Sequence, residues 1–137
     1  MVNVQWQGDM RFQATSVEGT SWMMDAYPEE GQVGAGPTPV QALVASVAGC
    51  MAMDVISILQ KKQQKVTSYR IDLEWERGPE GVYPRPITQL TLRHVFAGEG
   101  LDPTAVHRAI QLSDEKYCTV MATLRVCPSF ETVVEIQ

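Results

Sequence analysis

Histidine and cysteine are scarce in this sequence, with 2 and 3 residues respectively among 137. None of them forms a CxxC or HxxxH pair, the spacings typical of zinc and other transition-metal sites, so we expect neither a metal centre nor a cofactor. Positive charge is also in deficit, because 11 Lys and Arg face 16 Asp and Glu and leave a net charge of −5. An acidic surface excludes nucleic acid and anionic membranes as partners.

Nothing at the N-terminus resembles a signal peptide, and the sequence shows no internal repeat and no linker that would divide domains. Its first twelve residues, MVNVQWQGDMRF, alternate between polar and apolar and contain no apolar h-region. The apolar part of the central stretch is too short to predict a membrane span. It also contains many small residues and one charged residue, Asp54. We therefore expect a single cytoplasmic domain over residues 1–137. In that compartment, three cysteines suggest redox chemistry or inert core thiols rather than structural disulfides.

The dominant feature that is present is a long helix predicted over Thr38–Gln64. Thr38 is suited to cap its N-terminus, and Pro39 fits the first helical position. Apolar residues then recur at helical spacing, at Val40, Leu43, Val44, Val47, Met51, Val55, Ile56 and Leu59. At 1.5 Å per residue the helix is roughly 39 Å long, more than one small domain needs. A helix of this length and apolarity implies that sheets, a partner subunit or both surround it.

Alternating polar and apolar residues predict strands on both sides of this helix. The expected strands cover residues 2–6, 10–17, 20–25, 69–76, 88–97 and 130–136. A second helix begins at Asp102-Pro103, and Ser113 is suited to cap a restart of that helix just before Cys118. A Gly- and Pro-rich loop over residues 28–37 leads into the long helix. The order βββ-α-ββ-αα-β predicts an α+β fold.

Cys50 is the first candidate for chemistry because it lies in the middle of the long helix. Free cysteine is among the most buried residue types, so an inert core thiol is the simplest interpretation. Small neighbours, Ala48 and Gly49, and a second cysteine, Cys118, at a helix start where N–H groups favour a thiolate, support a reactive thiol instead. Cys50 itself lies roughly 18 Å inside its helix, beyond the reach of the helix dipole. Asp54, one turn later, disfavours a thiolate, so a reactive Cys50 requires a cation from elsewhere.

Two segments, AGCMAMDVISIL around Cys50 and EKYCTVMATL around Cys118, resemble the OsmC/Ohr family of thiol peroxidases. The resemblance covers essentially the whole chain and is greatest to the OsmC-like branch, which shares the GC-x-x-x-DV helix. It implies an intertwined homodimer in which long central helices are enclosed by antiparallel sheets, with two sites at the interface.

The same resemblance implies a function in oxidative stress defence. Cys50 would be the peroxidatic cysteine that attacks an organic hydroperoxide, and Cys118 would resolve the resulting sulfenic acid as a disulfide. A small dithiol or a lipoylated protein would then reduce that disulfide. Members that reduce peroxides use an Arg from an N-terminal strand to pair with the thiolate, and Arg11 is the matching candidate.

The sequence departs from the family pattern at three positions. Peroxide-reducing members place a Glu at the start of the long helix, where this chain has Val40 followed by Gln41. The second cysteine is commonly followed by Pro, whereas Cys118 is followed by Thr119. Cys127 has no counterpart in the motif, and we expect it to be structural. These departures keep an alternative open: a catalytically weak or inactive domain that binds a small apolar ligand at the dimer interface.

Overall fold

The computed structural model of the chain describes residues 1–30, 32–126 and 128–136. The chain forms two compact units, Met1–Ser46 and Val47–Gln137, and their boundary falls within the long helix α1 (Pro39–Lys61). Helices and antiparallel sheets are both present, which confirms the predicted α+β class. The expectation of a single domain stays a prediction.

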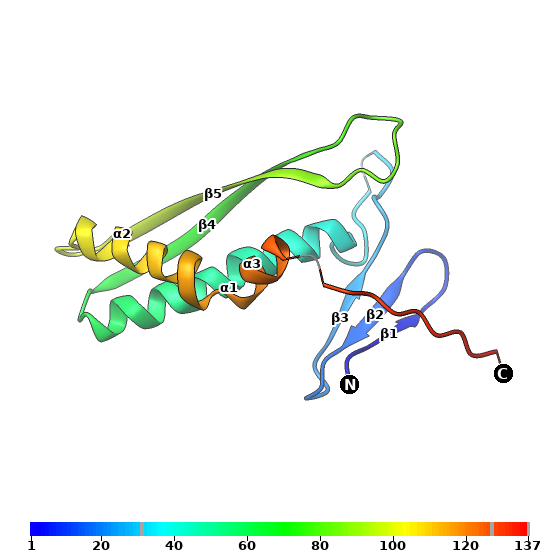
Figure 1. Cartoon of the computed structure of the whole chain (residues 1–137), viewed down its shortest axis with the longest axis horizontal. Coiled ribbons are helices and arrows are strands. Elements are labelled where there is room, and N and C mark those ends of the chain that lie inside the picture. The colour runs from blue at the N-terminus through cyan, green and yellow to red at the C-terminus, as the bar shows by residue number, and fades with distance from the viewer. Residues whose placement is uncertain (31, 127, 137) are drawn as a thin grey trace. The chain divides into compact units, whose positions relative to one another are not determined.

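A three-stranded antiparallel sheet forms much of the N-terminal unit, in the order β1-β2-β3. Its strands are β1 (Asn3–Trp6), β2 (Phe12–Thr15) and β3 (Ser21–Met24), each somewhat shorter than the sequence predicts (Figure 1). Gly8 and Asp9 connect β1 to β2 with φ angles of 91° and 49°, the left-handed conformation that tight turns use.

The loop that leads into α1 is held in place by Asp25 and Gly36. The Asp25 carboxylate accepts hydrogen bonds from the backbone N–H of Ala35 at 3.0 Å and of Ala26 at 2.8 Å. These two bonds lower the pKa of the Asp25 carboxyl. A Cβ at position 36 would collide with the Met23 carbonyl, so only glycine allows the loop to pass this close to β3. The predicted loop before the long helix is thus confirmed.

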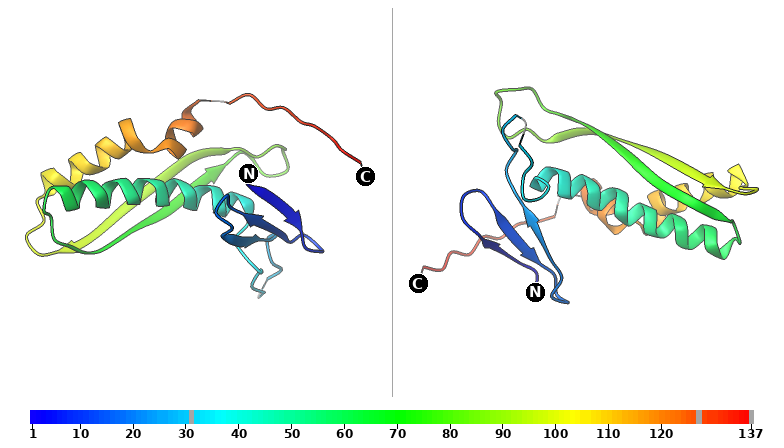
Figure 2. Two further views of the ribbon diagram at one scale, coloured as in Figure 1. Left: turned by 90° about the horizontal axis from the view of Figure 1, so that it is seen from below. Right: turned by 180° about the vertical axis from the view of Figure 1, so that it is seen from behind.

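The C-terminal unit contains a long hairpin and the remaining helices. Strands β4 (Val66–Arg77) and β5 (Ile87–Gly98) pair antiparallel along almost their whole length. Helix α2 (Pro103–Leu112) runs back along α1 in the opposite direction, and both helices lie along the hairpin (Figures 1 and 2). Asp102 caps α2 as predicted, since its Oδ1 accepts a hydrogen bond from the Thr104 N–H at 2.9 Å.

The core of this unit forms where the two helices meet. Val55 and Leu59 of α1 are fully buried and lie in one cluster with Ala105 and Ala109 of α2. Alanine at both α2 positions lets the helix axes approach closely, because its side chain adds little bulk between them. Partly buried residues of both helices and of the hairpin pack around this cluster, namely Ile58, Val66, Tyr69, Phe96, Val106 and Ile110.

The C-terminal segment differs from the prediction. The expected strand from Phe130 to Ile136 is not formed: residues 128–136 have no regular secondary structure and their side chains are exposed. An alternating sequence becomes a strand only when another strand satisfies its backbone hydrogen bonds. None of the described strands pairs with this segment, so its backbone lacks the hydrogen-bond partner that a strand requires.

Helix α1 has an unusual amount of exposed apolar surface. By length and composition it could cross a membrane, contrary to the expectation from the sequence, although the core helix of a soluble protein meets the same criterion. Only 28% of its most apolar 18-residue window is buried by the chain itself. Met53, at 76% exposed, is the clearest example. A further surface is needed to cover this helix.

Candidate thiol site

The two cysteines that the sequence singles out lie next to each other in the C-terminal unit. Cys50 is a partly exposed residue of α1, whereas Cys118 is only 3% exposed and lies just before α3 (Thr119–Arg125). Both are free thiols, and Cys50 neighbours Cys118 closely enough to raise the pKa of the Cys118 thiol. The fold therefore brings together two thiols from distant parts of the sequence.

A single turn of π-helix, η1 (Ser113–Tyr117), carries the chain from α2 to Cys118. The Cys118 N–H donates to the Ser113 carbonyl at 2.9 Å, which closes this wide turn. Cys118 itself is the N-cap of α3, and its Sγ accepts a hydrogen bond from the Met121 N–H at 3.4 Å. The helix restarts later than predicted: the chain stays helical through Ser113–Tyr117, and the residue that caps the new helix is Cys118 rather than Ser113. Single π turns of this kind often occur at functional sites.

Ser113 has a different role, which the sequence does not reveal. Its side chain is completely buried, and its hydroxyl donates to Asp54 Oδ2 at 3.0 Å. Asp54 lies one turn after Cys50 on α1, so this bond joins the helix that carries one thiol to the turn that leads to the other. Nothing in the local sequence distinguishes Ser113 from an ordinary helix cap, since its partner is distant in the chain.

The electrostatic environment corrects the prediction that Cys118 is the residue inclined to form a thiolate. Burial raises the pKa of the Cys118 thiol, because a thiolate loses hydration there, and the neighbouring Cys50 and Asp54 raise it further. The hydrogen bond from the Met121 N–H acts in the opposite direction but is the smaller effect. The raised pKa therefore favours a protonated Cys118 thiol at neutral pH.

Arg11, the predicted cation, belongs to the N-terminal unit. Its guanidinium makes an ion pair with the Asp9 carboxylate at 2.8 Å, and both side chains are well exposed. An exposed pair of this kind contributes little to stability, so it does not commit Arg11 to a structural role. The contact between Arg11 and Cys50 stays a prediction.

Gln41, which lies beside the position of the family's Glu, is engaged at the start of α1. The Gln41 N–H donates to Thr38 Oγ1 at 3.2 Å, and the Gln41 side-chain oxygen accepts from the Thr38 N–H at 2.8 Å. This reciprocal arrangement is a capping box, and it confirms Thr38 as the N-cap. The Gln41 amide thus serves to start the helix.

Two further expectations concern residues around the site. Cys127 lies outside the described residues, so its structural role stays a prediction. Among residues 1–30, 32–126 and 128–136, no three His, Cys, Asp or Glu side chains are grouped closely enough to hold a metal ion.

Comparison with known proteins identifies the family. The sequence model of a family described as "OsmC-like protein" matches residues 30–133. The chain belongs to the OsmC-like family. It is also 34% identical over 134 residues to protein YhfA of Escherichia coli (strain K12), an alignment that covers 95% of this chain and 96% of YhfA.

Solved structures of related proteins have the same fold. A hypothetical protein from Aquifex aeolicus VF5 is 26% identical with a TM-score of 0.77, over 91% of this chain and 86% of that protein. An organic hydroperoxide resistance protein OsmC from Legionella pneumophila has a TM-score of 0.63 at 17% identity, over 91% of this chain and 89% of its own. At 17% identity the likeness concerns the fold alone. These matches confirm the OsmC-like architecture expected from the resemblance.

The environment of Cys118 leads to a prediction about pH. In a Cys50→Ser, Cys127→Ser background, the midpoint of Cys118 alkylation should lie above that of an ordinary thiol, because burial and Asp54 disfavour the thiolate. Adding Asp54→Asn should lower the midpoint, since it removes a negative charge and keeps an oxygen that can accept from Ser113. Mass spectrometry of iodoacetamide adducts across a pH series measures both values.

The matched control for this measurement is Asp72→Asn, which removes an exposed carboxylate on β4 that pairs with Arg70. It should leave the midpoint unchanged. An equal shift in both variants would mean that net charge, rather than the position of Asp54, sets the reactivity of Cys118.

Proposed function

We propose that this chain is a cytoplasmic thiol-dependent peroxidase that reduces organic hydroperoxides in oxidative stress defence. The observation that carries the proposal is the adjacency of Cys50 and Cys118. Two neighbouring free thiols, one accessible and one buried, are the minimum that a sulfenic acid and disulfide cycle requires. Membership of the OsmC-like family supports the proposal, as does the fold shared with a protein named for organic hydroperoxide resistance.

The first step is attack by the Cys50 thiolate on the distal oxygen of the hydroperoxide. The O–O bond breaks, the sulfur becomes a sulfenic acid, and the alkoxide leaves and takes up a proton to become an alcohol. Cys118 then attacks the Cys50 sulfur, which forms the disulfide and releases the hydroxyl group together with the Cys118 proton as water. A small dithiol or a lipoylated protein supplies two electrons and two protons to restore both thiols.

The environments of the two cysteines support this division of roles. Cys50 is the more exposed thiol, so a peroxide reaches it more readily. Burial and a raised pKa keep Cys118 protonated and slow to react with peroxide on its own. The Ser113–Asp54 bond holds the turn before Cys118 against the helix that carries Cys50, which keeps the resolving thiol within reach. Ser113 and Asp54 are positioning residues in this scheme.

We propose Arg11 as the cation that stabilises the Cys50 thiolate. Cys50 lies roughly 17 Å along α1 from Pro39, so the N-terminal dipole of the helix does not reach it. Asp54, one turn away, disfavours negative charge on the sulfur. A guanidinium remains charged when it is desolvated. It can therefore compensate for the distant helix dipole and for the negative charge of Asp54.

The proposed peroxidase is a homodimer. Much of the apolar surface of α1 is left uncovered by its own chain, and Trp6 and Trp22 are 64% and 44% exposed. Exposed aromatic and aliphatic surface on this scale is typical of an interface rather than of a monomer. The unpaired segment 128–136 is also free to join a sheet edge of a second copy.

A specific observation favours the second candidate, a weakly active or inactive domain that binds a small apolar ligand at the dimer interface. The helix start lacks the acidic residue of peroxide-reducing members, and the neighbouring Gln41 is held in the capping box. Without a carboxylate to orient it, Arg11 would support the thiolate less well. In that case both thiols would be idle.

The thiol cycle predicts distinct results for the three cysteines. Cys50→Ser should abolish consumption of cumene hydroperoxide in the presence of a dithiol. Cys118→Ser should complete one turnover and then stall with oxidised Cys50, because no thiol resolves the sulfenic acid. Cys127→Ser is the control and should retain the full rate. Sustained turnover by Cys118→Ser would remove Cys118 from the cycle.

The Arg11→Met variant tests whether the Arg11 guanidinium stabilises the Cys50 thiolate. In a variant that lacks Cys118 and Cys127, this change should slow Cys50 alkylation at pH 7 about tenfold, equivalent to about 1.4 kcal/mol of lost thiolate stabilisation. Arg70→Met removes an exposed Arg from β4 and serves as the control. An unchanged rate in Arg11→Met would exclude Arg11 and would favour the ligand-binding alternative.

The dimer is tested by sedimentation velocity at low micromolar concentration. We expect a single species of twice the chain mass, because an interface that covers α1 would be large and apolar. Met53→Glu should weaken the association, since it places a charge on the exposed apolar face. A folded monomer of the unmodified protein at these concentrations would contradict the proposal.

A further inference from the structure

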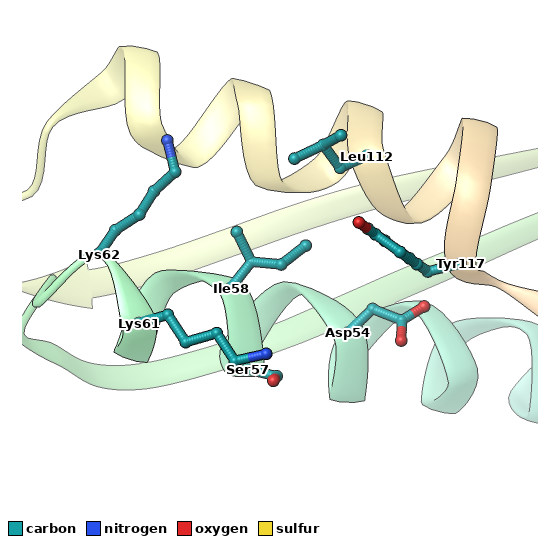
Figure 3. A pocket seen from close by; sticks show the side chains of 7 residues that line it. All are labelled: Asp54, Ser57, Ile58, Lys61, Lys62, Leu112 and Tyr117. Carbon is teal, nitrogen blue, oxygen red and sulfur yellow. The ribbon is translucent and has the colours of Figure 1, made fainter.

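A pocket of about 410 Å³ lies in the C-terminal unit between α1 on one side and α2 and η1 on the other. Seven residues line it, and Figure 3 shows their side chains: Asp54, Ser57, Ile58, Lys61, Lys62, Leu112 and Tyr117. Its volume falls in the range of small-molecule sites, which is about 300–1,000 Å³. Neither thiol lines this pocket, so the chemistry proposed above does not account for it.

Two lysines give the pocket its charge. In Figure 3, Lys61 extends back along α1 toward Ser57, while Lys62, in the turn after α1, extends toward α2. The ion pairs in the described part of the chain are Arg11–Asp9, Arg70–Asp72 and Arg125–Asp114, so both ammonium groups are available to a ligand. The formal charges of the two lysines and the one aspartate that line the pocket sum to +1. A monoanion would balance it.

The charges are separated along the pocket. Asp54 and Lys61 are seven residues apart on α1, roughly 10 Å along the helix axis. The Asp54 carboxylate is also engaged by the buried Ser113 hydroxyl. Of the two lysines, Lys62 extends toward α2 and away from Asp54 (Figure 3), so an anionic group bound at Lys62 lies away from the carboxylate.

Part of the wall between the charged ends is apolar, and Ser57 adds a polar group there. Ile58 and Leu112 face each other from α1 and α2, and the ring of Tyr117 extends from η1 over the α1 side of the pocket (Figure 3). A hydrated inorganic anion would gain little from this surface. A ligand with a hydrocarbon body would remove it from water, at about 25 cal/mol for each Å² of apolar surface buried.

Lysines near a helix C-terminus also complement the helix dipole. That effect accounts for a positive charge at Lys61, the last residue of α1. It does not require a second lysine beside the first, nor an apolar wall between the lysines and Asp54. Two cationic groups and an apolar patch in one pocket are the features that binding of an organic anion requires.

We propose that this pocket binds a monocarboxylate with an aliphatic body. The carboxylate lies between the Lys61 and Lys62 ammonium groups, and the chain covers Ile58 and Leu112 as far as the Tyr117 ring. This binding site goes beyond the proposed peroxidase function, because it requires neither thiol.

Calorimetric titration of the unmodified protein with octanoate tests the proposal. Octanoate should bind with defined stoichiometry, and 1-octanol and inorganic phosphate should each bind at least about tenfold more weakly, since each lacks one of the two features recognised. The Lys61→Ala, Lys62→Ala double variant should lose about tenfold or more in octanoate affinity, because it removes both charged donors. Lys65→Ala, an exposed lysine outside the pocket, is the control and should bind octanoate as the unmodified protein does.

Two results would overturn the proposal. One is the absence of octanoate binding, and the other is binding that the double variant retains or that Lys65→Ala loses equally. Cys50→Ser should bind octanoate normally, so this result is independent of peroxidase activity. If octanoate binds as expected and hydroperoxide is not consumed, the pocket stands while the proposed function fails.

Discussion

The buried hydrogen bond between Ser113 and Asp54 is the interaction on which the arrangement of the thiol site depends. A hydroxyl that is completely buried must be hydrogen-bonded, because an unsatisfied one would cost roughly 1–3 kcal/mol. Asp54 satisfies it, and the turn that begins at Ser113 is thereby held against α1. The Ser113 carbonyl in turn accepts the Cys118 N–H, so one residue links α1 to the position of the second thiol.

The π-helical turn serves two purposes in the C-terminal unit. It ends at Cys118, which then caps α3, and it also places Tyr117 in the pocket beside α2. The thiol pair and the pocket share Asp54, which lies between Cys50 and the two lysines along α1. The carboxylate that lines one end of the pocket is thus the same one that disfavours a thiolate at Cys118.

Helix α1 serves as a scaffold with unequal faces. Val55 and Leu59 are buried against the alanines of α2, whereas Met53 is exposed. A soluble chain seldom leaves so apolar a helix uncovered, since apolar surface in contact with water favours association. This imbalance is the physical basis for the proposed homodimer.

Much of the fold was predictable from the sequence because its signals are local. Thr38 and Asp102 cap their helices with hydrogen bonds to residues two or three positions away, and the alternation over residues 69–76 and 88–97 needs only the period of a strand. The segment Phe130–Ile136 alternates equally well, yet it forms no strand in this chain. A strand depends on a partner, and no local pattern supplies one.

The sequence by itself determined the α+β class, the long helix with its cap and the two cysteines that define the candidate site. Each of these follows from residue type and spacing within one segment. Tertiary structure alone decided that Cys50 and Cys118 are adjacent and that Ser113 donates a hydrogen bond to Asp54. It also decided that Lys61 and Lys62 line the same pocket as Leu112 and Tyr117. It also reversed the expectation for Cys118, whose position at a helix start suggested a thiolate. The reason is that burial, which raises the pKa of this thiol, depends on what the rest of the chain packs around it.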